Sequence, residues 1–447
     1  MRKKGKKFIS YPRLIVFYIL CTIVAGTVLL MLPISTRSGE SAGFEVAFFT
    51  ATSASCVTGL VLKDTYTFWS SFGQAVILLL IQVGGLGFMS FITLVSHTMG
   101  KSIGLRDRKL IMESSGSLEL DGILKMLKRI VIGTLSVELC GALLLSFRFC
   151  RDFGLWRGIY FSLFHSVSAF CNAGFDLMGI NEPFSSLASY VTDPLVNFTL
   201  ILLILIGGLG FIVWDDVLKN RLNFKRYRLH TKLVLTATVV LVFLPTVLFL
   251  VFEYNHSLNG LSIGEKILAS LFQAITPRTA GFATLNNSSF ADSTVLMTVV
   301  LMLIGGNSGS TAGGMKVTTI IVLLLSMISS SRKSDSISIF RRRIDYSVVH
   351  QASSIAFIYV AVTVIGTCIL CTVDGISLSA SLFEVSSAVG TVGSSMSMTP
   401  ALSSFSHYML TLLMFGGRAG GLTLALVLAE RKKNIQATHP LEKILIG

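Results

Sequence analysis

The sequence predicts an all-α polytopic membrane protein in which a unit of span, short re-entrant helix, loop and span occurs four times in pseudo-fourfold arrangement. Three observations lead to this fold class: the composition, the alternation of long and short apolar segments, and four matching loops. Of 447 residues, 52% are hydrophobic and only 13% are charged. A soluble domain typically has about 25% charged residues, so the composition indicates an integral membrane protein.

Long and short apolar segments alternate along the chain. A long segment can cross a bilayer, which takes about 20 residues, whereas a short one suits a helix that enters and leaves by the same side. The predicted spans are residues 14–33, 72–96, 130–149, 192–214, 233–252, 295–329, 348–373 and 408–429. The predicted re-entrant helices lie near residues 44–56, 157–171, 264–275 and 379–389.

These segments group into four repeats with polar segments between them. Most of the 37 Lys and Arg residues fall in the polar segments, so the positive-inside rule places these and both termini in the cytoplasm. The net charge of +14 is thereby explained without nucleic acid. The expected order is an N-terminal segment 1–12, repeat 1 (13–97), loop 98–124, repeat 2 (125–216), loop 217–231, repeat 3 (232–330), loop 331–346, repeat 4 (347–429) and a C-terminal segment 430–447.

The stretches around the short helices match one another. They read "FTATSASCVTG" (49–59), "FHSVSAFCNAG" (164–174), "FQAITPRTAG" (272–281) and "FEVSSAVGTVG" (383–393). Each begins with Phe and ends with Gly, and three have a Ser-Ala pair six and five residues before that Gly. The third copy is one residue shorter and has Thr-Pro nearby instead. Four matched copies indicate an internal repeat, which close packing of helices at glycine does not explain.

The loops that end these stretches predict an ion pore. Irregular backbone at membrane depth is tolerated only where it lines water or is buried in protein. Four such loops direct backbone carbonyl groups at a common axis, where the oxygens can replace the hydration shell of a cation. Glycine suits this role because it reaches unusual backbone angles and puts no side chain into the path. The four glycines are Gly59, Gly174, Gly281 and Gly393.

A polar stretch, "GGNSGSTAGG" (305–314), interrupts the sixth span. An unwound backbone there must line the aqueous path, on the cytoplasmic side of the glycine loops, and is a candidate gate. A phosphate-binding loop is the alternative, but Met315 separates Gly314 from Lys316 where that motif needs Gly and Lys adjacent. The candidate gating residues are Gly305, Gly306, Asn307, Ser308, Gly309, Ser310, Thr311, Ala312, Gly313 and Gly314, together with Arg418.

Arg418 lies in the eighth span with no carboxylate within ten residues along the chain. An intramembrane charge is costly and by default functional. Its expected partners are carbonyl and hydroxyl groups between Asn307 and Thr311; snorkelling of the side chain to the membrane surface is the alternative. Glu138, in the third span, is another intramembrane charge, and the sequence assigns it no role.

Two other classes of membrane protein fit less well. A secondary transporter with a solute site at the bilayer midplane typically has inverted repeats and paired broken helices, whereas this sequence has four parallel copies and one evident break. An intramembrane enzyme is not expected, because the sequence has no HExxH or GxSxG motif and no paired intramembrane acids.

The four repeats, the glycine loops and the interrupted sixth span resemble the Ktr/Trk/HKT superfamily of potassium transporters, most closely the KtrB-type membrane subunits, over nearly the whole chain. The resemblance implies potassium as substrate, bound by backbone carbonyls without a cofactor in this chain. Some plant members that carry sodium have Ser at the first filter glycine, so Gly59 favours potassium. The implied ion-binding residues are Val57, Thr58, Gly59, Asn172, Ala173, Gly174, Thr279, Ala280, Gly281, Thr391, Val392 and Gly393.

The resemblance also implies partners. A homodimer surrounded by lipid in the cell membrane is expected to dock a separate cytosolic ring of nucleotide-binding regulatory subunits. A sodium or poorly selective cation transporter of the same architecture is the alternative function, and sodium as an activator stays open. No repeat has a second glycine two positions after the first, so a shorter and less discriminating filter is expected than in tetrameric potassium channels.

Overall fold

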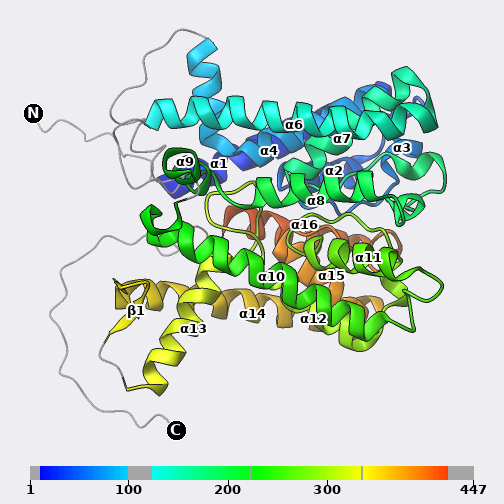
Figure 1. Ribbon diagram of the computed structural model, residues 1–447. Helices are drawn as coiled ribbons and strands as arrows, with labels where there is room; N and C mark the ends of the chain where they lie inside the picture. Colours follow the sequence, from blue (N-terminus) through cyan, green and yellow to red (C-terminus); the bar gives the residue numbers. More distant parts are fainter. Residues whose placement is uncertain (1–10, 99–122, 222, 334–335, 421–447) are drawn as a thin grey trace, which may run out of the picture.

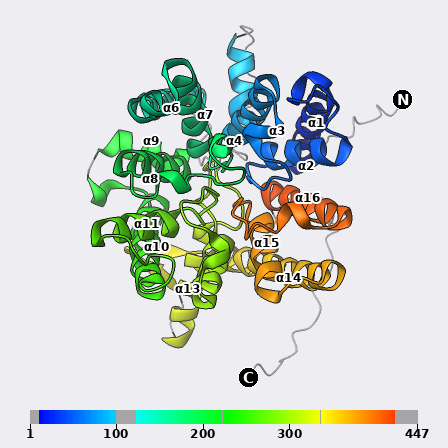
Figure 2. The ribbon, with the colours of Figure 1, turned by 90° about the vertical axis from the view of Figure 1, so that its right-hand side faces the viewer.

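The computed structural model describes residues 11–98, 123–221, 223–333 and 336–420. In these ranges the regular structure is helical apart from one two-stranded hairpin. Figure 1 shows the long helices running side by side in one bundle. Figure 2, turned by 90°, shows the repeats in sequence order around a common centre, from blue through green to orange. The last helix packs on helices of the first repeat, so the arrangement closes on itself.

One long helix opens each repeat. These helices are α1 (Tyr11–Met31), α6 (Ile123–Phe153), α10 (Leu229–Glu253) and α14 (Tyr346–Asp374). Among the described residues they are the four unbroken helices that are long and apolar enough to cross a membrane. Each points large apolar side chains outward, among them Phe17, Phe147, Phe243 and Phe357, which are 68%, 67%, 71% and 76% exposed. Exposed rings on all four helices form a surface suited to lipid rather than water.

A shorter helix follows in each repeat and ends near the centre of the molecule (Figure 2). These helices are α2 (Phe44–Ser55), α7 (Leu155–Phe170), α11 (Ile263–Ile275) and α15 (Leu378–Gly390), each within two residues of its prediction. The Phe that opens each repeated stretch packs into the core: Phe49, Phe164, Phe272 and Phe383 are at most 1% exposed. The repeated Phe therefore fixes the short helix in its repeat through apolar burial.

The second long segment is broken in each of the first three repeats, whereas the sequence predicted a break only in the sixth span. The segments are α4 (Ser71–Thr98), which is kinked; α8 (Pro194–Gly208) and α9 (Phe211–Asn220), which meet at 95°; and α12 (Asp292–Ile304) and α13 (Val317–Ser331). In the fourth repeat, α16 (Ser404–Ala419) ends at the limit of the described residues. The prediction of a continuous fourth span over 192–214 is therefore wrong. Residues 421–429 of the eighth predicted span lie outside the described residues.

A glycine in the left-handed region lies at each of the first two breaks: Gly87 and Gly210, with φ of 73° and 93°. Each stands three residues after another glycine, Gly84 and Gly207. In the third repeat, α12 is ended by Gly305, with φ of 62°. A left-handed residue ends a right-handed helix, and glycine adopts that conformation without a steric cost. The Gly-x-x-Gly spacing is therefore a sequence signal for the breaks in the first two repeats.

The remaining elements are short. They are α3 (Thr65–Phe68), the hairpin strands β1 (Ile337–Ile339) and β2 (Arg342–Ile344), and the 3-10 turns η1 (Pro33–Ser35), η2 (Met178–Ile180), η3 (Ala188–Tyr190), η4 (Phe224–Arg226), η5 (Asn287–Ser289) and η6 (Thr399–Ala401). The hairpin is antiparallel, with Ile337 opposite Ile344, in the loop predicted at 331–346. The predicted segments 1–12 and 98–124 lie mostly, and 430–447 wholly, outside the described residues.

Candidate functional site

The four glycine loops, which follow α2, α7, α11 and α15, share one backbone conformation. The glycines Gly59, Gly174, Gly281 and Gly393 have φ of 99°, 70°, 77° and 92°. Two positions earlier, Val57, Asn172, Thr279 and Thr391 also have positive φ, at 57°, 58°, 69° and 51°. For a side chain other than glycine this conformation costs roughly 1–3 kcal/mol, and such strain concentrates at functional sites. The internal repeat therefore extends to a strained backbone in all four copies.

Each glycine loop is anchored to the short helix of its own repeat by one Ser or Thr. Its backbone carbonyl accepts a hydrogen bond from the N–H of the residue before the glycine, at 2.8 or 2.9 Å in every copy. The pairs are Thr58 N–Ser53 O, Ala173 N–Ser168 O, Ala280 N–Thr276 O and Val392 N–Ser387 O.

The hydroxyl groups of the same residues add a second bond. The Oγ of Ser53 and of Ser387 accepts from the N–H of Gly59 and of Gly393, each at 3.0 Å. The hydroxyls of Ser168 and Thr276 donate instead to carbonyl groups just past the glycine, Phe175 O at 2.7 Å and Phe282 O at 2.6 Å. The Ser-Ala and Thr-Pro positions noted in the sequence thus hold the loops, a role that spacing alone did not reveal.

The four glycine loops meet in a closed ring. A methyl group built on Gly59 would lie 2.5 Å from the carbonyl oxygen of Ala173, and one on Gly174 would lie 2.8 Å from that of Ala280. A methyl group on Gly281 would meet the carbonyl oxygen of Val392, and one on Gly393 that of Thr58. Each glycine therefore abuts the next loop, and the fourth returns to the first. A Cβ fits at none of the four positions.

A cavity of about 320 Å³, here called the mouth cavity, opens on one side of this ring. All four glycines line it, together with Asp64 and Asp176. Asp64 is fixed by backbone donors, including the N–H of Phe184 at 3.0 Å. The pKa of Asp176 is raised to about 6, mainly by burial and in smaller part by the nearby charge of Asp64. The two carboxyl groups make the mouth cavity attractive to cations at neutral pH.

The interrupting loop, residues 305–316 between α12 and α13, lies on the other side of the ring. A Cβ on Gly313 would meet the side chain of Thr391, and the hydroxyl of Thr311 donates to Phe170 O at 3.1 Å. Thr391 and Phe170 both precede the glycine of their loop, whereas the mouth cavity is lined by the glycines and residues that follow them. The interrupting loop is therefore seated directly beneath the ring.

Four hydrogen bonds join the interrupting loop to the break between α8 and α9. Asn307 Nδ2 donates to Gly208 O at 2.8 Å, and Phe211 N donates to Gly309 O at 2.8 Å. The interrupting loop of the third repeat is thus hydrogen-bonded to the bend between α8 and α9 in the second repeat.

Two cationic side chains hold the interrupting loop. Arg418, from α16, donates from Nη1 to Thr311 O at 2.5 Å and from Nη2 to Gly84 O. The expected contact with the stretch from Asn307 to Thr311 is present, and one guanidinium joins repeats 1, 3 and 4. Lys316 Nζ donates to Ala312 O at 2.8 Å and to Gly313 O at 3.0 Å. Lys316 was absent from the predicted site, although its intramembrane charge was a signal for it.

The structure places the twelve predicted ion-binding residues together in the ring, and the ten predicted loop residues beneath it with Arg418. Asp64 and Asp176 were missed, because no sequence pattern indicates that the segments after the glycines line the same cavity. Glu138 now has partners: Gln82 Nε2 donates to it at 3.2 Å, and Cys171 Sγ lies 3.9 Å away. Cys171 is the C-cap residue of α7 and directly precedes the second glycine loop, so Glu138 contacts the start of that loop.

The sequence matches known proteins along its whole length. Residues 13–437 match the TrkH family model, described as a cation transport protein. "Ktr system potassium uptake protein B" of Bacillus subtilis is 41% identical, covering 95% of this chain and 94% of its own. "Potassium/sodium uptake protein NtpJ" of Enterococcus hirae is 37% identical, covering 100% and 99%. "Ktr system potassium uptake protein B" of Vibrio alginolyticus is 35% identical, covering 100% and 97%.

A solved structure has the same fold. The crystal structure of the potassium transporter TrkH from Vibrio parahaemolyticus matches with a TM-score of 0.73 at 17% identity, covering 96% of this chain and 87% of that one. The chain therefore belongs to the TrkH family of cation transport proteins and is a multi-pass membrane transporter, not an enzyme.

Proposed function

We propose that the protein is the pore-forming subunit of a Ktr-type system for potassium uptake, with four span–pore-loop–span repeats in pseudo-fourfold arrangement around one ion pore. The closed ring of glycine loops carries this proposal. In it the carbonyl groups of Thr58, Ala173, Ala280 and Val392 each lie against the glycine of a neighbouring repeat. Two relatives named as Ktr potassium uptake proteins, at 41% and 35% identity, support the same substrate.

A cation reaches the ring through the mouth cavity, where Asp64 and Asp176 raise its local concentration. Carbonyl oxygens of the twelve ring residues then replace its hydration shell, which suits a weakly hydrated monovalent cation and needs no carboxylate ligand. A ring held by bonds at 2.8 to 3.0 Å in every repeat keeps these oxygens in place and so favours one ion size. The sodium alternative is supported by the name of the 37% identical relative, a potassium/sodium uptake protein.

The interrupting loop is the proposed gate. It occupies the position beneath the ring that a cation must pass, and it brings the charges of Arg418 and Lys316 there. Fixed positive charges near the path repel a cation in a low-dielectric surrounding. Opening requires the loop to release Arg418 and the carbonyl groups of the second repeat, while the ring above stays bonded.

Orientation and partners complete the proposal. The Lys and Arg distribution supports cytoplasmic termini and loops, with the mouth cavity facing outward. The name "Ktr system" of the relatives supports a separate cytosolic regulatory subunit on the inner face, and we propose a homodimer as its platform. If sodium is an activator, rubidium uptake will depend on added sodium.

Gly59→Ser tests the proposal. The added side chain enters a position where the Ala173 carbonyl oxygen lies 2.5 Å away, so the ring must widen or distort. In reconstituted vesicles, rubidium uptake by the variant is expected to be inhibited more strongly by sodium than uptake by the wild type. Gly39→Ser is the matched control, because Gly39 also has positive φ, at 73°, but has open space around it. Unchanged sodium inhibition in folded Gly59→Ser protein would refute the assignment of the ring as the filter.

A further inference from the structure

A second repeated position lies behind the glycine loops. The residue after the repeated Phe is polar in every copy: Thr50, His165, Gln273 and Glu384. These side chains are buried in the short helices, with at most 3% exposure. A buried polar group costs free energy unless it is hydrogen-bonded, so four of them at one aligned position require partners.

Three of the four reach the same place, the third residue after the glycine. His165 Nε2 accepts from the N–H of Leu177 at 3.3 Å, and Gln273 Nε2 contacts Thr284 Oγ1 at 3.5 Å. Glu384 Oε1 accepts from the N–H of Met396 at 2.9 Å. In the first repeat the equivalent residue, Thr50, has the shortest side chain of the four. In these three repeats, the aligned polar residue therefore connects the segment that follows the glycine loop to the short helix that precedes it.

Glu384 makes the strongest of these ties. Besides Met396 N, its Oε1 accepts from Ser395 Oγ at 2.5 Å, and its Oε2 accepts from Thr399 Oγ1 at 2.7 Å. All three partners present donors, which matches an ionised carboxylate, an acceptor on both oxygens. Hydrogen bonds to a charged group are roughly twice as strong as neutral ones.

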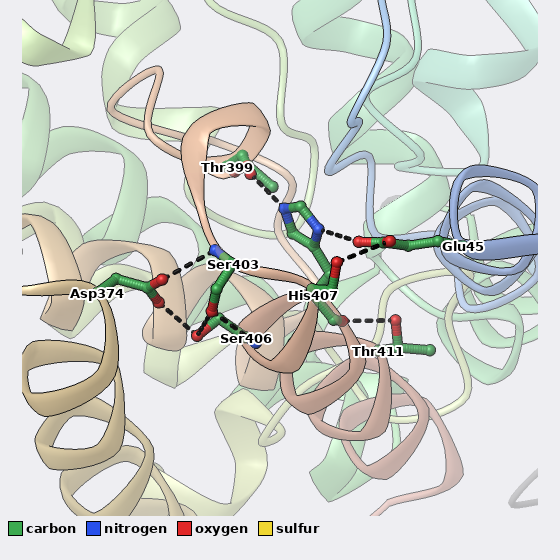
Figure 3. Close-up of polar contacts among 8 residues, drawn as sticks. Glu45, Asp374, Thr399, Ser403, Ser406, His407 and Thr411 are labelled. Atoms are coloured by element: carbon green, nitrogen blue, oxygen red, sulfur yellow. Dashed lines mark hydrogen bonds and ion pairs between the residues drawn. The ribbon is translucent and has the colours of Figure 1, made fainter.

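The backbone carbonyl group of Thr399 also has a hydrogen-bond partner. Its carbonyl oxygen lies 2.9 Å from His407 Nε2, while His407 Nδ1 lies 2.6 Å from Glu45 Oε1 (Figure 3). The bond to His407 lowers the pKa of Glu45, so that carboxyl group is an acceptor. The ring of His407 therefore connects the backbone of Thr399, in the fourth repeat, to Glu45 in the first repeat.

The fourth glycine loop is consequently attached at two points to one helix, α15. Ser387 holds the N–H of Gly393, and Glu384, one turn earlier on α15, holds Met396. We propose that Glu384 is a positioning residue for ion selection, which fixes the carbonyl groups of Thr391, Val392 and Gly393 through the segment 395–399. This inference rests on the proposed function, because it assigns a residue that sets the selectivity of the same ring.

Glu384→Gln tests the inference, since the amide keeps the shape but replaces one acceptor oxygen by a donor that faces other donors. The matched control is Glu253→Gln. Glu253 is an equally buried carboxylate that accepts from Ala291 N at 2.9 Å and Ser257 Oγ at 2.8 Å, and it contacts no glycine loop. Rubidium uptake, its inhibition by sodium, and thermal unfolding are measured on all three proteins in the same vesicles or detergent.

In Glu384→Gln we expect the rubidium-over-sodium preference to fall about tenfold, as for the loss of one charge-assisted hydrogen bond, with uptake retained. Glu253→Gln is expected to lower the unfolding temperature and leave the preference unchanged. A wild-type preference in folded Glu384→Gln would overturn the inference, and an equal loss of preference in Glu253→Gln would do the same.

Thr399→Val provides a second route if Glu384→Gln does not fold. It removes one donor to Glu384 at nearly constant volume, and a smaller loss of preference is expected in the same direction. An unchanged preference in this variant would overturn the inference. Failure of the proposed function is distinguishable, because the wild-type protein itself would then show no rubidium uptake or no preference for rubidium over sodium.

Discussion

The glycine loops and the interrupting loop both consist of irregular backbone, but they are held in different ways. Each glycine loop is bonded to the short helix of its own repeat, with matching distances in all four copies. The interrupting loop has hydrogen bonds within its own repeat and also to other repeats: to Gly208 and Phe211 in the second, and to Arg418 in the fourth, which also contacts Gly84 in the first.

We infer from this difference that the glycine loops are the fixed element and the interrupting loop is the movable one. A loop bonded within its own helix–loop unit moves only if that unit deforms, and here the unit is packed into the core by buried Phe side chains. A loop bonded between repeats can leave its seat when a few bonds break, while every helix stays folded. Glycine content alone did not distinguish the two; the location of the hydrogen-bond partners does.

Removing Ser308 to Ala312 is expected to give the largest effect. The deletion takes out the segment beneath the ring, so rubidium uptake should rise by at least about tenfold, the change for loss of one strong restraint. Selectivity should persist, because the ring belongs to other stretches of the chain. Uptake at the wild-type rate by well-folded deleted protein would show that the interrupting loop is not the gate.

Arg418→Ala should also raise uptake, by about tenfold if its charge-assisted bonds contribute about 1.5 kcal/mol to the closed state, the lower end for such bonds. Combined with the deletion, the two effects should not multiply, since both remove the same obstruction. Uptake measured for each variant and the combination gives the coupling. Multiplicative effects would mean that Arg418 acts elsewhere than on the loop.

A pair of glycines in the broken helices sharpens the comparison. Gly210→Ala places a methyl group 2.7 Å from Ser308 O and should push the interrupting loop from its seat, raising uptake severalfold. Gly87→Ala has the same left-handed strain but nothing within 4 Å of the added methyl group, so uptake should change little. Equal uptake in both variants would show that the strained backbone, not contact with the loop, matters at these breaks.

Neighbouring serines on α15 test the fixed element. Ser387→Ala removes the acceptor for Gly393 N and should lower rubidium-over-sodium preference about fivefold, as for one neutral hydrogen bond of about 1 kcal/mol. Ser386→Ala is the control, because the buried Ser386 hydroxyl has no hydrogen-bond partner among the described residues. Sodium inhibition of rubidium uptake is the readout, and equal values for the two variants would contradict a role for the anchor.

The smallest effect concerns the approach to the ring rather than either loop. The pKa of Asp176 is raised to about 6, so its carboxyl group is charged above that pH and neutral below it. Uptake at limiting potassium should therefore fall about twofold as external pH drops from 7 to 5, as expected for one charge acting through water. Asp176→Asn should remove this dependence. A pH profile shared by wild type and variant would assign the effect to another group.

The sequence was sufficient for the repeats, the first helices and the ring positions, because apolar length and the spacing from Phe to Gly are local properties. It was insufficient for the breaks at Gly87 and Gly210, because the apolar residues on both sides of these glycines are typical of an unbroken span. Asp64 and the anchors of the buried Glu384 depend on contacts between distant segments. Such contacts leave no pattern in one sequence.

Because one chain supplies all four quarters of the ring, each quarter can vary alone. Thr58, Ala173, Ala280 and Val392 occupy equivalent places with four different surroundings, because the aligned residues on the short helices are Thr50, His165, Gln273 and Glu384. In an assembly of four identical subunits, any substitution appears four times and its consequences multiply. Here a mutation alters a single quadrant, so in the proposed filter selection can adjust ion preference in small steps.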